Sequence, residues 1–136
     1  MEQIYSKVEE DTLLHMIHKV SDCIDDRVDF SPEIEFLQVA SLKLPKGKKF
    51  RAHKHIFYKK VTNITQESWV VIRGKVRAFL YDLDDTIIKE TDLGPGDFTI
   101  TYRGGHNYLI LEEDTLVYEF KTGPYFGIEK DKVFIK

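Results

Sequence analysis

Two histidines, His53 and His55, flank a lysine in this sequence. Their residue type and their spacing suit metal binding. If Phe50–Phe57 forms a strand, side chains two residues apart point to the same face, so both imidazoles can meet one metal ion. Further along the chain, Glu67 adds a carboxylate and His106 a third imidazole. Such a set suits a divalent first-row transition metal with one or two open positions, and iron, manganese, nickel, copper and zinc all qualify.

Strands are the elements that must position these side chains. From residue 33 onward the apolar residues recur with a period of two, and turn residues such as Gly94-Pro95-Gly96-Asp97 separate the short runs. No helical pattern alternates with the runs, which argues against a parallel α/β fold and favours an all-β sandwich or jelly-roll barrel. The expected strands are Ile34–Leu44, Phe50–Phe57, Ser68–Arg73, Lys75–Asp82, Thr86–Thr91, Asp97–Tyr102, Asn107–Glu112 and Thr115–Lys121.

The first 32 residues follow a different pattern. Leu13, Ile17 and Val20 recur at helical spacing, which predicts a helix from residue 11 or 12 to about residue 25, although the same stretch also suits a strand. We therefore expect residues 1–32 to form an extension whose short helix or strand packs outside a barrel of residues 33–136. Its apolar stripe offers a surface for a homodimer.

Two further histidines, His15 and His18, lie in this extension at a spacing that places them on one side of a helix. They are outside the stretch that carries the other candidate ligands. A solvated or interface role is the interpretation that the sequence favours for them.

Composition narrows the function classes. The chain has 136 residues, 42% of them hydrophobic, and a formal net charge of −3, so no basic excess points to nucleic acid. A single cysteine, Cys23, fits a reducing compartment, and no apolar run approaches the roughly 20 residues that span a bilayer. With a polar start instead of a signal peptide, the sequence leads us to expect a cytoplasmic protein without membrane or nucleic-acid partners.

The glycines around the candidate ligands carry a family resemblance. Gly47, His53-Lys54-His55, Glu67 and Gly74 together resemble the first motif of the cupin superfamily. The second motif is similar to Gly94-Pro95-Gly96-Asp97 followed by Gly104-Gly105-His106. The resemblance covers about Ile34 to Lys121 and implies a double-stranded β-helix barrel.

In metal-binding cupins the two histidines, the glutamate and the later histidine hold the metal, which here implies His53, His55, Glu67 and His106. Eleven residues separate His55 from Glu67, more than in the usual motif. The economical interpretation is a longer hairpin loop at residues 59–65 that leaves Glu67 in place, and Gln66 is the alternative ligand.

Three functions remain open at this point. The favoured one is a metal-dependent enzyme, an isomerase or dioxygenase that acts on a small polar molecule such as a sugar or sugar nucleotide. Tyr108, Tyr102 and Glu119 are its candidate proton-transfer residues. The alternatives are a non-catalytic cupin that senses a small ligand or metal, and a metal-free sugar-nucleotide isomerase with histidine as acid and base.

Overall fold

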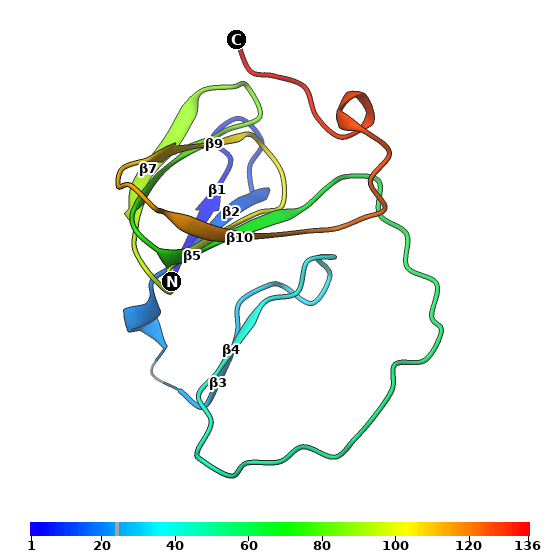
Figure 1. Ribbon diagram of the computed structural model, residues 1–136. Helices are drawn as coiled ribbons and strands as arrows, with labels where there is room; N and C mark the ends of the chain where they lie inside the picture. The colour runs from blue at the N-terminus through cyan, green and yellow to red at the C-terminus, as the bar shows by residue number, and fades with distance from the viewer. Residues whose placement is uncertain (24) are drawn as a thin grey trace.

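The computed structural model describes residues 1–23 and 25–136, and nearly all of its regular elements are antiparallel strands (Figure 1). The prediction of an all-β protein is confirmed. The strands are β1 (Glu2–Tyr5), β2 (Leu13–His18), β3 (Arg27–Asp29), β4 (Ala40–Leu42), β5 (Glu67–Arg73), β6 (Val76–Tyr81), β7 (Ile87–Leu93), β8 (Phe98–Thr101), β9 (His106–Ile110) and β10 (Leu116–Lys121). Two short 3₁₀ turns, Val20–Asp22 and Ile128–Lys130, complete the elements.

The strands form three antiparallel sheets. The five-stranded sheet has the order β1-β2-β8-β5-β10, the three-stranded sheet has the order β7-β6-β9, and β3 pairs only with β4. Over the described residues the sheets do not close into a barrel, so β9 and β10 are edge strands. An edge strand presents backbone groups that can pair with a further strand.

Six of the expected strands, those from residue 68 to residue 121, are confirmed with bounds that differ by two residues or fewer. They end where the turn residues predicted it. Positive φ angles at Gly74, Gly96 and Gly104 lie in turns that connect these strands.

The N-terminal segment is a strand and belongs to the five-stranded sheet, where β2 lies between β1 and β8. The expected placement outside the body is therefore not what the structure has. All six residues of β2 are buried, and a strand buried on both faces loses the period of two that marks half-exposed strands. Leu13 and Ile17 lie in the core and cannot provide the dimer surface that we expected of them. Residue 24, inside the expected helix, lies outside the described residues.

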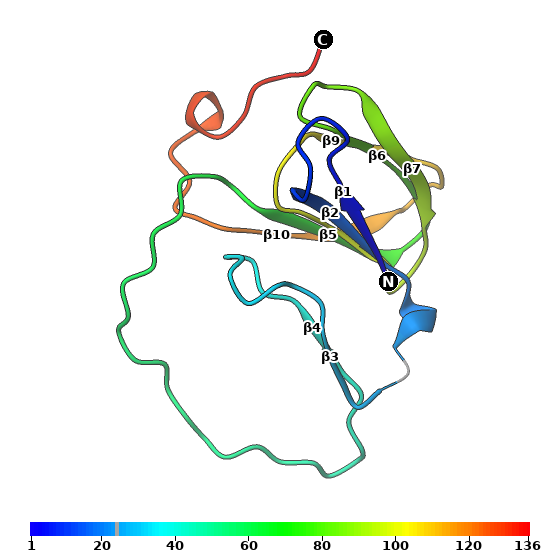
Figure 2. The same cartoon turned by 180° about the vertical axis from the view of Figure 1, so that it is seen from behind.

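The structure differs most from expectation between residues 33 and 66. Only β4 forms within the expected strand Ile34–Leu44, and the expected strand Phe50–Phe57 has no strand pairing. Residues 43–66, called the arm below, leave the end of β4, swing clear of the sheets and return at the start of β5 (Figures 1 and 2).

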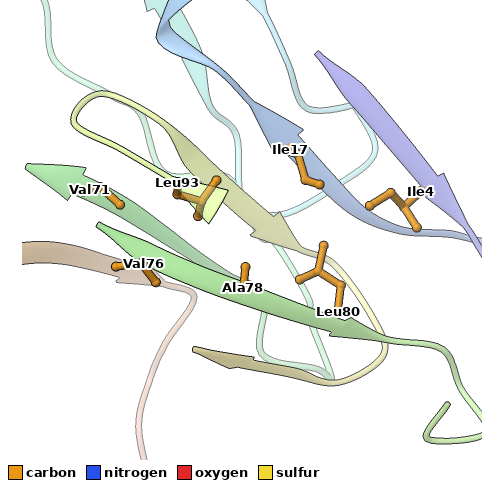
Figure 3. Packing of buried hydrophobic residues seen from close by; sticks show 7 residues of the cluster. All are labelled: Ile4, Ile17, Val71, Val76, Ala78, Leu80 and Leu93. Carbon is orange, nitrogen blue, oxygen red and sulfur yellow. The ribbon is translucent and has the colours of Figure 1, made fainter. Parts of the chain in front are cut away.

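Two clusters of buried apolar residues cover the two faces of the five-stranded sheet. The first joins it to the three-stranded sheet, and Figure 3 draws seven of its members: Ile4, Ile17, Val71, Val76, Ala78, Leu80 and Leu93. The second packs Phe30 and neighbours of the β3–β4 region against Met16, Phe98 and Ile100. The central sheet is thus covered on both sides, and the first cluster occupies the face that also carries the candidate site.

One glycine between β5 and β6 is required by its surroundings. A Cβ on Gly74 would lie 2.8 Å from the Thr115 backbone Cα, and the φ of Gly74 is +81°. We expect Gly74→Ala to lower the free energy of unfolding by about 1–3 kcal/mol, measured by urea denaturation. Gly94→Ala is the control, since a Cβ there meets nothing within 4 Å. Equal stability of the two variants would contradict the prediction.

Candidate functional site

The carboxylate and the third histidine of the predicted set meet between the sheets. Glu67 is the first residue of β5 and His106 the first of β9, and the structure places Glu67 Oε1 3.2 Å from His106 Nε2. Glu67 is buried, and the other ring nitrogen of His106, Nδ1, is buried without a hydrogen-bond partner among the described residues. An imidazole and a carboxylate brought into contact are chemically suited to a divalent transition metal.

Two aromatic side chains, Trp69 and Tyr108, lie next to Glu67 and His106. Trp69 Nε1 lies 3.0 Å from Glu67 Oε1, to which it donates a hydrogen bond, and 3.2 Å from Glu119 Oε2. The Trp69 ring stacks on Tyr108 with a centroid distance of 4.0 Å and an interplanar angle of 9°. The Tyr108 hydroxyl shares a 2.8 Å hydrogen bond with Thr99. Two of the three proposed proton-transfer residues, Tyr108 and Glu119, are therefore brought near the site.

The strand register extends the site across the five-stranded sheet. Thr101 of β8 pairs with both His15 of β2 and Glu67 of β5, and Glu67 in turn pairs with Lys121 of β10. Directly opposite residues share one face of a sheet and are close neighbours. A polar row of His15, Thr101, Glu67 and Lys121 therefore crosses the face that His106 contacts.

Electrostatics keep the carboxylate charged. Burial raises the pKa of Glu67, but the hydrogen bond and charge of His106, together with Lys132 and Lys121, outweigh burial and hold that pKa below its ordinary value. Burial also raises the pKa of Tyr108 well above its ordinary range. The Tyr108 hydroxyl is therefore protonated at neutral pH and can act as a hydrogen-bond donor.

His15 lies fully buried in the polar row. Its Nε2 is 2.9 Å from the Tyr81 carbonyl oxygen and its Nδ1 is 3.1 Å from Thr101 Oγ1. Because a carbonyl only accepts, Nε2 carries the proton and Nδ1 accepts from the hydroxyl. Burial lowers the pKa of His15 to about 4, against a smaller opposing effect of the Tyr81 hydrogen bond. The solvated or interface role expected of His15 and His18 does not fit, since both are buried.

The remaining predicted ligands, His53 and His55, are exposed on the arm. Their ring centroids are 5.5 Å apart. They are not assembled with Glu67 and His106, and no cluster of three or more potential metal-ligating residues occurs in residues 1–23 and 25–136.

Gln66, the alternative ligand, makes its side-chain hydrogen bonds outside the candidate site. Its side chain accepts a 2.8 Å hydrogen bond from the Leu37 backbone and donates to Glu35 Oε2. Glu35 is also paired with Arg103, with 2.8 Å between Arg103 Nη1 and Glu35 Oε1. Glu35 and Arg103 line a surface hollow whose lining does not include Glu67 or His106. This cluster therefore ties residues 31–39 to the sheet and leaves Glu67 as the carboxylate of the site.

Sequence reasoning misplaced one residue and missed others. Tyr102 is fully buried in the second apolar cluster, where its hydroxyl contacts Met16 Sδ at 3.2 Å, so it is not brought to the site. The sequence singles out neither Trp69 nor Lys121 as a site residue, and it assigns His15 a solvated or interface role instead. Nothing in the spacing of the sequence marks them, because their proximity follows from the strand register.

Comparison with protein-family models, with curated proteins and with solved structures finds no match to this chain. In the part of the chain that the structure describes, none of the helices has the length and apolar character needed to cross a bilayer.

Proposed function

We propose that this protein is a metal-binding cupin that uses Glu67 and His106 from the sheets and His53 and His55 from the arm to hold one divalent transition metal ion. The observation that carries the proposal is the contact of Glu67 with His106 on the inner face, at the start of edge strand β9. The buried, unpartnered Nδ1 of His106 supports it, because a buried polar atom without a partner is costly in the absence of a ligand or further contact.

The arm can supply the other two ligands by adding to the open edge of β9. Ile56 and Phe57 are 84% and 97% exposed, so both apolar side chains would be available to pack against the body in this closed form. Its 24 residues can span up to about 80 Å when extended, ample to reach β9. As a fourth strand next to β9, residues 50–57 would turn both histidines to one face and make the three-stranded sheet half of a jelly roll.

Charge favours this closure. The arm contains eight Lys and Arg residues and no acidic residue, whereas the rest of the chain carries twelve Lys and Arg residues against 23 acidic ones. Opposite net charges attract the arm to the body, most strongly at low ionic strength. The closed form is our proposal for the double-stranded β-helix that the cupin resemblance implies.

With three imidazoles and one carboxylate, the metal would retain open positions for a substrate oxygen, which a divalent ion polarises as a Lewis acid. We therefore favour an enzyme acting on a small polar molecule, as an isomerase or dioxygenase. The Tyr108 hydroxyl, held by Thr99, would donate a hydrogen bond inside the site. A metal-free isomerase is the second candidate, because the contact between Glu67 and His106 is itself an acid–base pair.

Metal titration tests the proposal directly. Trp69 is the only tryptophan and donates to Glu67, so its fluorescence should report on the site. We expect chelator-treated protein to show a saturable fluorescence change with Mn²⁺, Fe²⁺, Co²⁺, Ni²⁺ or Zn²⁺, and elemental analysis after desalting to give one ion per chain. If none of these ions is retained or changes the fluorescence, the metal proposal is wrong and the acid–base candidate takes its place.

A further inference from the structure

Strand β10 is the last strand of the five-stranded sheet, and its outer edge has no partner strand in residues 1–23 and 25–136 (Figure 1). The Thr122 backbone N–H donates a 3.0 Å hydrogen bond to the Gln66 carbonyl oxygen and so continues the ladder between β10 and β5. The backbone groups of successive residues point to alternate edges of a strand, so residues 118 and 120 also bond toward β5. The N–H and C=O groups of residues 117, 119 and 121 therefore point to the open edge.

The side chains along this edge differ between the two faces of the sheet. Tyr118 and Phe120 are 53% and 54% exposed and share one face. Glu119 and Lys121 share the opposite face, where 3.4 Å separates Lys121 Nζ from Glu119 Oε1. An open edge with exposed apolar side chains is a template for a further strand. One residue of each charge sign on the same edge makes this template complementary to a copy of itself.

Strand geometry limits how a second copy can pair with this edge. A two-fold axis places the two β10 strands antiparallel, and only outward-facing residues can exchange backbone hydrogen bonds. With Phe120 on the axis, Glu119 lies opposite the partner's Lys121 at two equivalent places. With residue 119 or residue 121 on the axis, that residue would lie opposite its own copy, and like charges directly opposite are destabilising. An axis at Tyr118 would place Glu119 opposite the partner's Val117 and leave its charge unmatched.

We infer that two copies of this chain form a homodimer by antiparallel pairing of their β10 strands, with Phe120 at the two-fold axis. Each pair of Glu119 with the partner's Lys121 would exchange two backbone hydrogen bonds and bring opposite charges together on one face. On the other face the two Phe120 rings would be direct neighbours, an arrangement that stabilises strand pairing. The five-stranded sheets of the two copies would then become one continuous sheet. This interface uses neither the arm nor the edge of β9, so it is independent of the proposed metal site.

Mixing two charge variants of the full chain tests the interface. Glu119→Lys would leave only lysines in the two cross-strand pairs and Lys121→Glu only glutamates, so each variant alone should dimerise about 10-fold more weakly than the wild type in analytical ultracentrifugation. An equimolar mixture should dimerise about as well as the wild type, because every pair between unlike chains again joins a lysine and a glutamate. Residues 119 and 121 of one chain stay like-charged in the mixture, so the recovery must come from contacts between chains. Glu90→Lys, the same charge change at an exposed position of β7, is the control and should dimerise like the wild type.

Cross-linking tests the register separately. Directly opposite residues of a pair without hydrogen bonds have Cα atoms about 4.5 Å apart, which suits a disulfide. In a Cys23→Ser background, Phe120→Cys should therefore give a covalent dimer on oxidation with glutathione disulfide, whereas Tyr118→Cys, opposite the partner's Thr122, should not. The inference is overturned if the wild-type protein is monomeric at every concentration, if mixing restores no dimer, or if Tyr118→Cys cross-links in place of Phe120→Cys.

Discussion

Replacing either histidine of the arm with alanine is expected to weaken metal binding more than about 100-fold, whereas Lys54→Ala should leave the affinity unchanged. Loss of a residue that merely supports a ligand already costs 10–100-fold, and loss of a ligand should cost more. His53 and His55 would share the face that meets Glu67 and His106, and Lys54 would point away. Competition with a chromophoric chelator measures the affinities.

The exposure of the arm makes these variants informative. His53, Lys54 and His55 are all exposed, so their substitution should not change the thermal midpoint of the metal-free protein. His106→Ala is the reference for loss of a ligand from the body. If the two arm variants bind metal as tightly as the wild type while His106→Ala does not, the arm does not close over the site and our placement of the ligands is wrong.

Acidification is expected to destabilise the metal-free protein by about 3 kcal/mol between pH 6.5 and pH 4 through His15 alone. The folded protein keeps this ring neutral down to a pKa of about 4, whereas the unfolded chain binds a proton near the ordinary value of 6.5. The unfolded state therefore binds more protons across this window, and the free energy of unfolding falls by about 1.4 kcal/mol for each pH unit. Below pH 4 both states are protonated at His15, and its contribution stays constant.

Urea denaturation at pH 7, 6, 5 and 4.5 measures the effect. A lowered pKa of His18, which has burial as its main cause, adds to the slope in the same direction. Glu67 and Asp82 have lowered pKa values, so their contributions disappear only at pH values below about 4.5. His15→Gln should flatten the profile by most of its slope, and the exposed His55→Gln should keep it. A wild-type profile that is flat from pH 7 to pH 4.5 would contradict the prediction.

Local patterning was sufficient for the body of the fold. Period-two apolar residues and turn glycines located β5 to β10, because half-exposed strands and tight turns impose residue preferences that are visible within a few positions. The same patterning failed for β2, since a strand buried on both faces shows no alternation and Leu13 and Ile17 matched a helical spacing by coincidence. It also predicted a strand at Phe50–Phe57, which has no strand pairing in this structure.

The sequence by itself determined which residue types could bind a metal and that an all-β body would carry them. Only the tertiary structure decided which residues meet. Strand register placed His15, Thr101 and Lys121 on the row of Glu67, brought Trp69 within hydrogen-bond distance of that carboxylate, and assigned Tyr102 to the core on the other face. Strand register joins residues up to 86 positions apart along the chain, as in the pairing of His15 with Thr101, and no local spacing encodes such pairings.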